Sequence, residues 1–488
     1  MHTKSESVSA TQTAIFFVHP SETPSPTQAM GSLDGTHSVR PELTAVSTAD
    51  LQQTNRTFVP QNALTMTNTP NPPGTQGAIA QGLANASGVL EIKVEQRSAS
   101  LLALKTENQD QSCVFVSQYG NLDLTSPTLI KRGTSSSDNN AAYFGLNSAV
   151  LASEAGSIRM SGGTIQSIND NSPGVTAVGS GTTIRLLDLN LETNGAYSPG
   201  SMTRYQGLIA LSRVNITTTG PNSPAVSVEH EGDPITLTGG ILRTSGVGSP
   251  CFMASGDIVA EAVTCHANLA EIAIVEGSNR LTLRNSNATS GLPNKWGILL
   301  YQELARDPGI GNTYFLAEGG NLVYTDTTSP LFFVTNTTGH ITLKEVQLTL
   351  PSKVLLKAGM NDRWGTIGSN GGMVDFLADN SMLTGDFVAD AQSTLGLRLT
   401  NNTRLTGAVN NANTAKQVVV ALESGSTWVL TNDSHIGQLT GAEFSSNTIT
   451  NITGNGKNLY YLPALNPTLG GNTYALTGGG SLTPEPAP

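Results

Sequence analysis

The sequence predicts an all-β protein built as a single right-handed parallel β-helix, and three observations support this. A Ser-Pro dipeptide recurs at a nearly constant interval, and short runs of alternating apolar and polar residues fill the space between its copies. The composition is also unusual, because only 12% of the 488 residues are charged while 51 are glycine. A typical soluble domain has about 25% charged residues. Backbone hydrogen bonds and stacked small apolar residues must therefore provide most of the order.

The two ends of the chain differ from its body. Residues 1–76 are rich in Ser, Thr, Pro and Gln, so we expect a disordered leader or stalk there. Within it, Ala14–Val18 is too short for the apolar region of a secretory signal, which needs about 7 residues. Residues 484–488 contain three prolines and are expected to form an exposed tail. The β-helix itself is predicted to span residues 77–483.

The repeat is defined by Ser172-Pro173, Ser198-Pro199, Ser223-Pro224 and Ser249-Pro250, which follow one another at intervals of 26, 25 and 26 residues. A further copy, Ser329-Pro330, lies 80 residues later, close to three more periods. A glycine precedes three of these serines by three residues. We expect each copy to form a corner, in which glycine supplies an unusual backbone angle and proline fixes φ.

The segments between corners have the pattern of half-buried strands. Between corners, apolar residues alternate with polar ones after one shift of phase, as in Ile184, Leu186, Leu187, Leu189 and Leu191, and residues 341–350 and 395–399 repeat the pattern. A unit of 25 or 26 residues with two or three short strands fits one coil of a parallel β-helix. It is too short for a propeller blade, which needs about 40 residues, and it lacks the leucine-rich repeat frame. About 16 coils fit in the body, and residues 101–105 are expected to cap the first one.

Composition excludes several classes of protein. The net charge of −11 argues against a nucleic-acid partner. The sequence contains no apolar run of the roughly 20 residues that a transmembrane helix needs. The three cysteines, Cys113, Cys251 and Cys265, are expected to be buried free thiols, although Cys251 and Cys265 could pair across a turn.

With the coils defined, the chain resembles the pectin-lyase-like superfamily of right-handed β-helix proteins. The residues that carry this resemblance include 143–152, 296–302 and 363–366, and residues 383–386 and 426–428 are similar to the last coils of autotransporter passenger domains. The resemblance covers residues 110–483 and implies the fold. Because passenger domains of this type are commonly surface adhesins, it also implies an adhesin-like role by analogy.

The sequence offers one weak candidate for a catalytic site. Polygalacturonase-like hydrolases share Asn-Thr-Asp, Asp-Asp, Gly-His-Gly and Arg-Ile-Lys motifs, none of which occurs in this chain. The best local cluster is Glu229, His230, Glu231 and Asp233, which could supply an acid/base pair or bind Ca²⁺, whereas a solvated turn between strands is the favoured interpretation. Arg363 beside Trp364 could stack on a sugar, but a packed Trp covered by its Arg neighbour is the simpler interpretation.

These observations favour a non-enzymatic, adhesin-like protein at the cell surface or outside the cell, which presents a long face to polysaccharide or to a host or cell-surface protein. The alternative is a polysaccharide lyase or glycoside hydrolase. We expect a monomer without a required cofactor.

Overall fold

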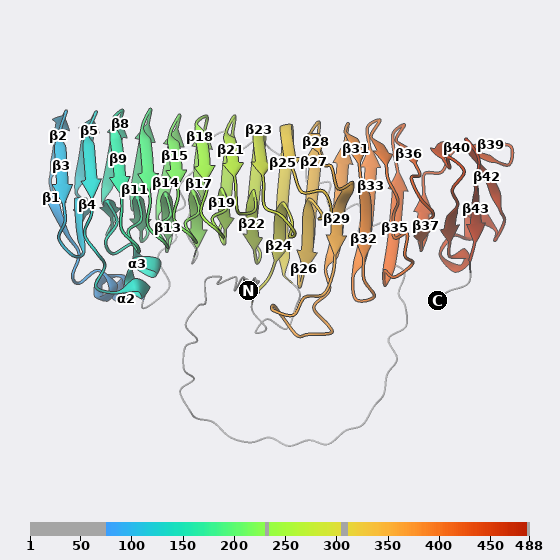
Figure 1. Ribbon diagram of the computed structural model, residues 1–488, viewed down its shortest axis with the longest axis horizontal. Coiled ribbons are helices and arrows are strands. Elements are labelled where there is room, and N and C mark those ends of the chain that lie inside the picture. The colour runs from blue at the N-terminus through green and yellow to red at the C-terminus, as the bar shows by residue number, and fades with distance from the viewer. Residues whose placement is uncertain (1–74, 230–233, 304–310, 486–488) are drawn as a thin grey trace, which may run out of the picture. The chain divides into compact units, whose positions relative to one another are not determined.

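The computed structural model describes residues 75–229, 234–303 and 311–485, and over these residues the chain is a parallel β-solenoid of about 15 turns (Figure 1). The predicted all-β class and parallel β-helix are therefore confirmed, and a right-handed solenoid fits the structure. Residues 1–74, which make up most of the predicted leader, lie outside the described residues.

Sheet A takes one strand from each of the first twelve described coils, and neighbouring strands are parallel. Its strands, in spatial order, are β1 (Ser87–Lys93), β4 (Gln111–Ser117), β7 (Val150–Ala152), β10 (Val175–Val178), β13 (Ser201–Arg204), β16 (Val226–Glu229), β19 (Phe252–Ala254), β22 (Ala273–Glu276), β24 (Ile298–Tyr301), β26 (Phe332–Thr335), β29 (Val354–Ala358) and β32 (Asp386–Ala389).

Sheet B takes two short strands, or one long strand, from most coils. Its described strands are β2 (Gln96–Ser100), β3 (Ala103–Thr106), β5 (Asn121–Thr125), β6 (Thr128–Lys131), β8 (Ser157–Ser161), β9 (Thr164–Ser167), β11 (Thr183–Leu187), β12 (Asn190–Thr193), β14 (Leu208–Ser212), β15 (Asn215–Thr218), β17 (Ile235–Thr238), β18 (Ile241–Thr244), β20 (Ile258–Glu261), β21 (Thr264–Ala267), β23 (Arg280–Ser290), β25 (Asn312–Tyr324), β27 (Thr338–Lys344), β28 (Gln347–Thr349), β30 (Met373–Asp379), β33 (Thr394–Thr400), β35 (Gln417–Leu422) and β38 (Gln438–Thr440).

Sheet C closes the C-terminal coils, and its last strands include two antiparallel pairs, β39 with β40 and β42 with β43. Its strands are β31 (Met382–Thr384), β34 (Arg404–Thr406), β36 (Thr427–Val429), β37 (Ser434–Ile436), β39 (Phe444–Ser445), β40 (Thr448–Thr453), β41 (Leu459–Tyr461), β42 (Tyr474–Thr477) and β43 (Ser481–Pro484). The described helices are α2 (Thr75–Gly82), α3 (Asp138–Phe144), and the 3₁₀ turns η1 (Pro463–Leu465) and η2 (Pro467–Leu469).

The Ser-Pro corners stack on one another through a buried hydroxyl ladder. The backbone N–H of Ser198 donates to Oγ of Ser223 at 2.9 Å, and the N–H of Ser223 donates to Oγ of Ser249 at 2.9 Å. Each hydroxyl in turn donates to a backbone carbonyl of the preceding coil, as Ser223 does to Gly195. Ser329-Pro330 also leads into a strand of sheet A, β26, which lies three strands after β19. The predicted spacing of three further periods is thus confirmed.

The predicted reason for the corner glycines was wrong. Gly195, Gly220 and Gly246 do not have positive φ; the left-handed residue is the one directly before the serine, such as Tyr197 at 52° or Asn222 at 52°. A Cβ atom on Gly220 would instead overlap the backbone carbonyl of Gly195. Glycine is therefore required because the corners of adjacent coils approach closely, backbone against backbone.

The shift of phase between paired strands also has a backbone cause. Asp188 between β11 and β12 and Arg213 between β14 and β15 both have φ of 52°, in the left-handed region. Such a residue bends the chain, and it explains why Leu186 and Leu189 both point inward although they are three residues apart. The two bend residues also pair with each other, with Arg213 Nε 2.6 Å from Asp188 Oδ1.

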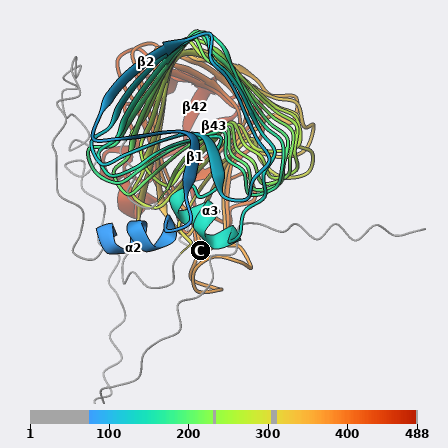
Figure 2. The same ribbon diagram turned by 90° about the vertical axis from the view of Figure 1, so that its left-hand side faces the viewer.

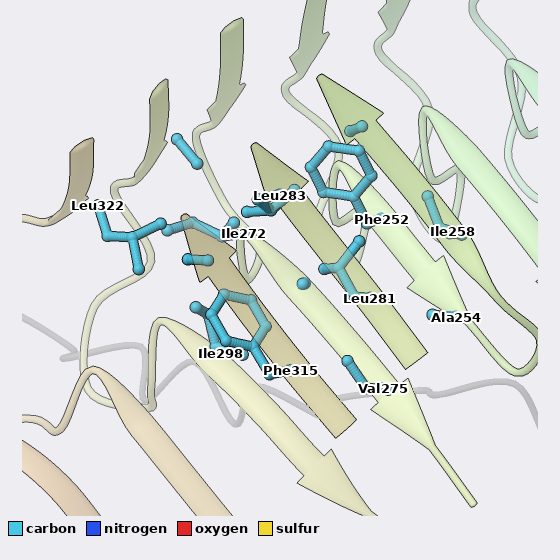
Figure 3. Packing of buried hydrophobic residues seen from close by; sticks show 14 of the residues in the cluster. Phe252, Ala254, Ile258, Ile272, Val275, Leu281, Leu283, Ile298, Phe315 and Leu322 are labelled. Atoms are coloured by element: carbon cyan, nitrogen blue, oxygen red, sulfur yellow. The ribbon is translucent and has the colours of Figure 1, made fainter. Parts of the chain in front are cut away.

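The core is a long column of apolar side chains inside the coils. In Figure 3, Phe252, Ile298 and Phe315 lie among Leu, Ile, Val and Ala side chains from neighbouring strands. Phe252 pairs in register with Val226 on one side and Ala273 on the other, so each inward residue packs against the coils before and after it.

The coils are not of uniform length. The register pairs Val226 with Phe252, 26 residues apart (252 − 226), but Ile298 with Phe332, 34 residues apart (332 − 298). The extra residues of the longer coil lie outside the paired strands, because the strands themselves stay in register. A fixed period therefore holds only for part of the chain.

Cys251 and Cys265 form a disulfide, so the expectation of free thiols was wrong for this pair. The two residues are 14 apart in sequence, and their Cα atoms are 6.2 Å apart. Cys251 precedes β19 and Cys265 lies in β21, so one coil brings both side chains into its interior. Cys113 is a buried free thiol as expected, and burial raises its pKa to about 11.

The ends of the solenoid are finished differently. α2 and α3 lie on the outside of the first coils (Figure 2), where Ile79 of α2 and Leu83, which directly follows α2, pack with Phe115 and Leu151 on the outer face of sheet A. Residues 101–105, the predicted cap, belong to the first coil, and 103–105 are part of β3. At the other end, Pro484 belongs to β43 and Glu485 accepts a hydrogen bond from His435, while 486–488 lie outside the described residues.

Candidate functional site

The ends of adjacent strands in sheet A carry a row of polar side chains on the outer face of the solenoid. Val228, Val275 and Leu300 point into the core, so the residue after each of them points outward. The strand register places these outward residues in one line: Arg204, Glu229, Ser255, Glu276, Tyr301 and Thr335. We call this line the outer row.

Glu276 is the most perturbed carboxyl group in the outer row. Its pKa is raised to about 7, mainly by burial and also by the negative charges of Glu303 and Glu229, while a hydrogen bond from Ser255 opposes the shift. In that hydrogen bond Ser255 Oγ donates to Oε2 of Glu276 at 2.7 Å. The Glu303 side chain forms a hydrogen bond with Glu276 that favours its protonated form. Glu276 is thus about half protonated at neutral pH.

Tyr301 lies beside this carboxyl group, because it pairs with Glu276 in the strand register. Its side chain is only 7% exposed, and its ring lies 4.5 Å from that of Trp364. Burial and the charges of Glu276, Glu303 and Glu229 raise the pKa of Tyr301 well above its ordinary value. The phenol therefore stays protonated. Among the described residues its hydroxyl makes no hydrogen bond.

Glu229 has a different partner. Its Oε2 lies 3.1 Å from Nη2 of Arg204, and the Arg204 side chain is 3% exposed. Arg204 also donates through Nε to the carbonyl of Ala142 in α3 at 2.9 Å. The ion pair therefore connects α3 to sheet A, and it occupies one face of the Glu229 carboxylate.

An aromatic cluster borders the outer row. Trp296 stacks on Phe333 with ring centroids 4.5 Å apart, and Trp364 is 6% exposed in the same cluster. Asn370 Nδ2 donates to the carbonyl of Trp364 at 2.6 Å and so fixes the loop that carries it. The Arg363 guanidinium lies 5.2 Å from the Trp364 ring, which confirms a packed Trp covered by its Arg neighbour.

A second arrangement lies on the outer face of sheet B. Arg280, Tyr314, His340 and Asp375 are neighbours in the strand register, and we call them the planar ladder. The Arg280 guanidinium lies 4.9 Å from the Tyr314 ring, and the Tyr314 and His340 rings are stacked at 4.7 Å and 11°. His340 Nδ1 lies 3.0 Å from Asp375 Oδ2, and its Nε2 lies 2.9 Å from Asn312 Oδ1.

A row of charges runs beside the planar ladder, four residues further along the same strands. Glu318 Oε1 lies 2.7 Å from Lys344 Nζ, and Glu318 Oε2 lies 3.7 Å from Arg284 Nε. The hydrogen bond from Lys344 lowers the pKa of Glu318. This part of sheet B is thus a partly exposed surface of polar groups held in fixed positions.

The structure brings together only part of the predicted cluster. Glu229 is the last residue of β16, whereas His230, Glu231 and Asp233 lie outside the described residues, so an acid/base or Ca²⁺ role for the four remains a prediction. Within the described residues, no group of three or more His, Cys, Asp or Glu side chains is placed to hold a metal ion. No helix in that same part of the chain is long and apolar enough to cross a membrane.

The sequence interpretation missed Glu276, Tyr301 and Glu303, although it contained a signal for the outer row. Arg204 and Glu229 each lie six residues after a corner serine (204 − 198 and 229 − 223). Counting six residues from the Ser-Pro corners would have aligned Arg204, Glu229, Ser255 and Thr335. It would not have found Glu276 or Tyr301, because no Ser-Pro corner precedes their strands.

Comparison of the chain with protein-family models, with curated proteins and with solved structures found no match. The parallel β-solenoid is therefore defined by the structure itself, and function must be argued from its surfaces.

Proposed function

We propose that the protein is a non-enzymatic, adhesin-like β-solenoid that binds polysaccharide along the outer face of sheet B. The planar ladder is the observation that carries this proposal. Its rings stack on one another along the solenoid, so their polar edges form a line that follows the solenoid axis. Strands in a sheet lie about 4.8 Å apart, which gives this line a regular spacing suited to an extended chain of hydroxyl-rich rings.

Rigidity supports this assignment. The stacking of Tyr314 on His340 and the hydrogen bonds of His340 to Asp375 and Asn312 hold the side chains in place before a ligand arrives. Binding to such a preorganised surface costs less side-chain entropy than binding to mobile side chains. A flat polar surface with donors and acceptors fits a polysaccharide better than a protein partner, because the centres of protein–protein interfaces are depleted of charged residues.

The location outside the cell or at its surface also belongs to this proposal. Disulfides persist in oxidising compartments and are rare in the cytosol, and the Cys251–Cys265 disulfide supports export for that reason. The resemblance to pectin-lyase-like and autotransporter passenger proteins agrees with such a role.

A glycan array probed with the full chain tests the proposal. We expect binding to extended polysaccharides, loss of that binding in Tyr314→Ala, and retention in the control Tyr119→Ala, which removes a tyrosine that is 82% exposed and outside the planar ladder. Equal binding by the two variants, or capture of proteins but of no glycan, would contradict the proposal.

A second candidate function is polysaccharide cleavage by a lyase or glycoside hydrolase at the outer row. It is favoured by Glu276, whose pKa of about 7 suits a general acid at neutral pH, next to the carboxylates of Glu229 and Glu303. Release of reducing sugar, or of unsaturated products that absorb in the ultraviolet, would support it if Glu276→Gln abolished the turnover. Binding without any turnover would exclude it.

A further inference from the structure

We propose that the corner between β21 and β22 holds a buried water molecule, which is bound by Glu271, Trp296 and Tyr324. The site is buried, so the inference is independent of the glycan-binding surface proposed above. It names water as the ligand and gives this ligand a structural role, which is to connect neighbouring coils where the serine ladder of the corners is interrupted.

The interruption follows from the strand register. Continued back to the corners, the register aligns Ser249-Pro250 with Ala270-Glu271 in the next coil and with Lys295-Trp296 in the coil after it. The N–H of Ser223 donates to the hydroxyl of Ser249, but Ala270 has no hydroxyl group that could accept from the N–H of Ser249. The dipeptide returns only at Ser329-Pro330. Two consecutive coils therefore lack the corner hydroxyl.

Three buried polar atoms at this interruption have no hydrogen-bond partner within the part of the chain that the structure describes: Glu271 Oε1, Trp296 Nε1 and Tyr324 Oη. The Glu271 side chain is 1% exposed, and that of Tyr324 is 0% exposed. The great majority of buried polar side-chain atoms in proteins are bonded to protein or to ordered water. A single ligand that bonds to all three atoms accounts for them together.

The backbone places the three groups side by side. Tyr324 is aligned in register with Ser290, and the Ser290 hydroxyl donates to the carbonyl of Ala270, directly before the buried glutamate, at 2.8 Å. A Cβ atom on Gly297, the residue after Trp296, would lie 3.1 Å from Cγ of Tyr324. The phenol and the indole thus both adjoin the corner that carries the carboxyl group.

The electrostatics agree with this arrangement. Burial raises the pKa of Glu271, whereas the charge of Lys295 and the indole N–H of Trp296 lower it. Burial and the charge of Asp326 raise the pKa of Tyr324 to about 12, and the charge of Glu271 adds to this shift. The indole therefore acts on the carboxyl group although neither Nε1 nor Oε1 makes a direct hydrogen bond. A bridging water gives a donor and an acceptor this relation.

Water matches the chemistry of the three groups. The indole N–H and the phenol O–H are donors, and the carboxyl Oε1 is an acceptor. A water oxygen accepts from both donors while one of its hydrogens is donated to Glu271, and buried waters typically make about three such bonds. A metal cation does not fit, because the indole N–H of Trp296 is a donor only and has no lone pair to offer.

Cross-relaxation between water and the indole protons tests the inference by NMR on the full chain with isotope-labelled tryptophan, since the sequence contains only three tryptophans. A cross peak from a long-lived water is expected at the Trp296 indole, which Trp296→Phe identifies. Trp428 is the internal control, because its side chain is equally buried but its Nε1 donates directly to the carbonyl of Gly407 at 2.9 Å. Its indole should show no such peak.

Two variants extend the test. Glu271→Gln keeps a carbonyl oxygen as acceptor and should keep the cross peak. The double variant Ala270→Ser/Glu271→Pro restores the Ser-Pro corner and removes that acceptor, so it should lose the peak, and a thermal melt checks that it is folded. Equal signals from Trp296 and Trp428, or a peak that persists in the folded double variant, would overturn the inference.

A crystal structure of the full chain gives the same answer directly. We expect an ordered water at about 2.7–3.2 Å from Glu271 Oε1, Trp296 Nε1 and Tyr324 Oη. A direct hydrogen bond from Trp296 to Glu271 with no water between them would overturn the inference.

Discussion

Replacing Glu276 by glutamine is expected to stabilise the protein at mildly alkaline pH and to leave its stability nearly unchanged in acid. The pKa of this carboxyl group is about 7 in the folded protein, against an ordinary value of 4.5. The folded state therefore binds the proton more tightly than the unfolded state. The free energy of unfolding of the wild type must fall as the pH rises from about 4.5 to about 7, and it stays low above that.

The size of the effect follows from the same two values. The difference is 2.5 pH units (7 − 4.5), and each unit corresponds to about 1.36 kcal/mol, so the wild type loses about 3 kcal/mol between acid and about pH 8. Glutamine avoids this loss because it stays neutral. Its carbonyl can still accept the hydrogen bond from Ser255, and its amide can donate to Glu303.

Urea unfolding followed by circular dichroism at about pH 4 and about pH 8 measures the difference. Glu318→Gln is the matched control with the opposite sign, because the hydrogen bond from Lys344 lowers the pKa of Glu318. That variant should lose stability above about pH 4.5 and match the wild type in acid. If the free energies of unfolding of Glu276→Gln and the wild type differed by the same amount at both pH values, the reasoning would be refuted.

Two further perturbations test the packing of the coils. Gly220→Ala should destabilise the protein by about 3 kcal/mol, because the added Cβ would overlap the Gly195 carbonyl. The control Gly77→Ala has open space around it in α2 and should be neutral or stabilising. Equal urea midpoints for the two variants would contradict the close approach of the corners. Arg204→Met removes the cation of a buried ion pair and should lower the free energy of unfolding by about 3 kcal/mol. The double variant Arg204→Met/Glu229→Gln should regain most of this loss, because it leaves no unpaired charge. Thermal melts in which the double variant shows no recovery would argue against the ion pair.

The repeat made the architecture predictable. A Ser-Pro dipeptide every 25 or 26 residues is a strong signal because the corner serines form a ladder, in which each backbone N–H reaches the hydroxyl of the next coil. The alternation of Ile184 and Leu186 was equally informative, since inward residues of a coil must be apolar. Both signals arise from contacts that repeat along the chain.

Features that depend on one contact between residues of different coils, or of different parts of a coil, were less predictable. The need for glycine at Gly220 comes from a neighbouring carbonyl, and composition cannot distinguish that from a need for positive φ. Cys251 and Cys265 pair because one coil turns both side chains inward, which their spacing of 14 residues does not determine.

The candidate site could be predicted only in part. Glu229 was found because it lies in a dense acidic segment, but Glu276 and Tyr301 are isolated in sequence. They join Glu229 only through the strand register. Tyr301 packs against Trp364, which lies 63 residues further along the chain (364 − 301), and no local pattern indicates that contact.

Calorimetry with the polysaccharide that binds best on the glycan array tests the central claim most directly, namely that the polar face of sheet B is a binding surface. If the planar ladder is that surface, Tyr314→Ala should weaken binding at least about tenfold, as expected for the loss of a central contact of more than 1.4 kcal/mol. The control Tyr119→Ala should bind like the wild type. A Tyr314→Ala variant that binds with unchanged affinity would contradict the claim.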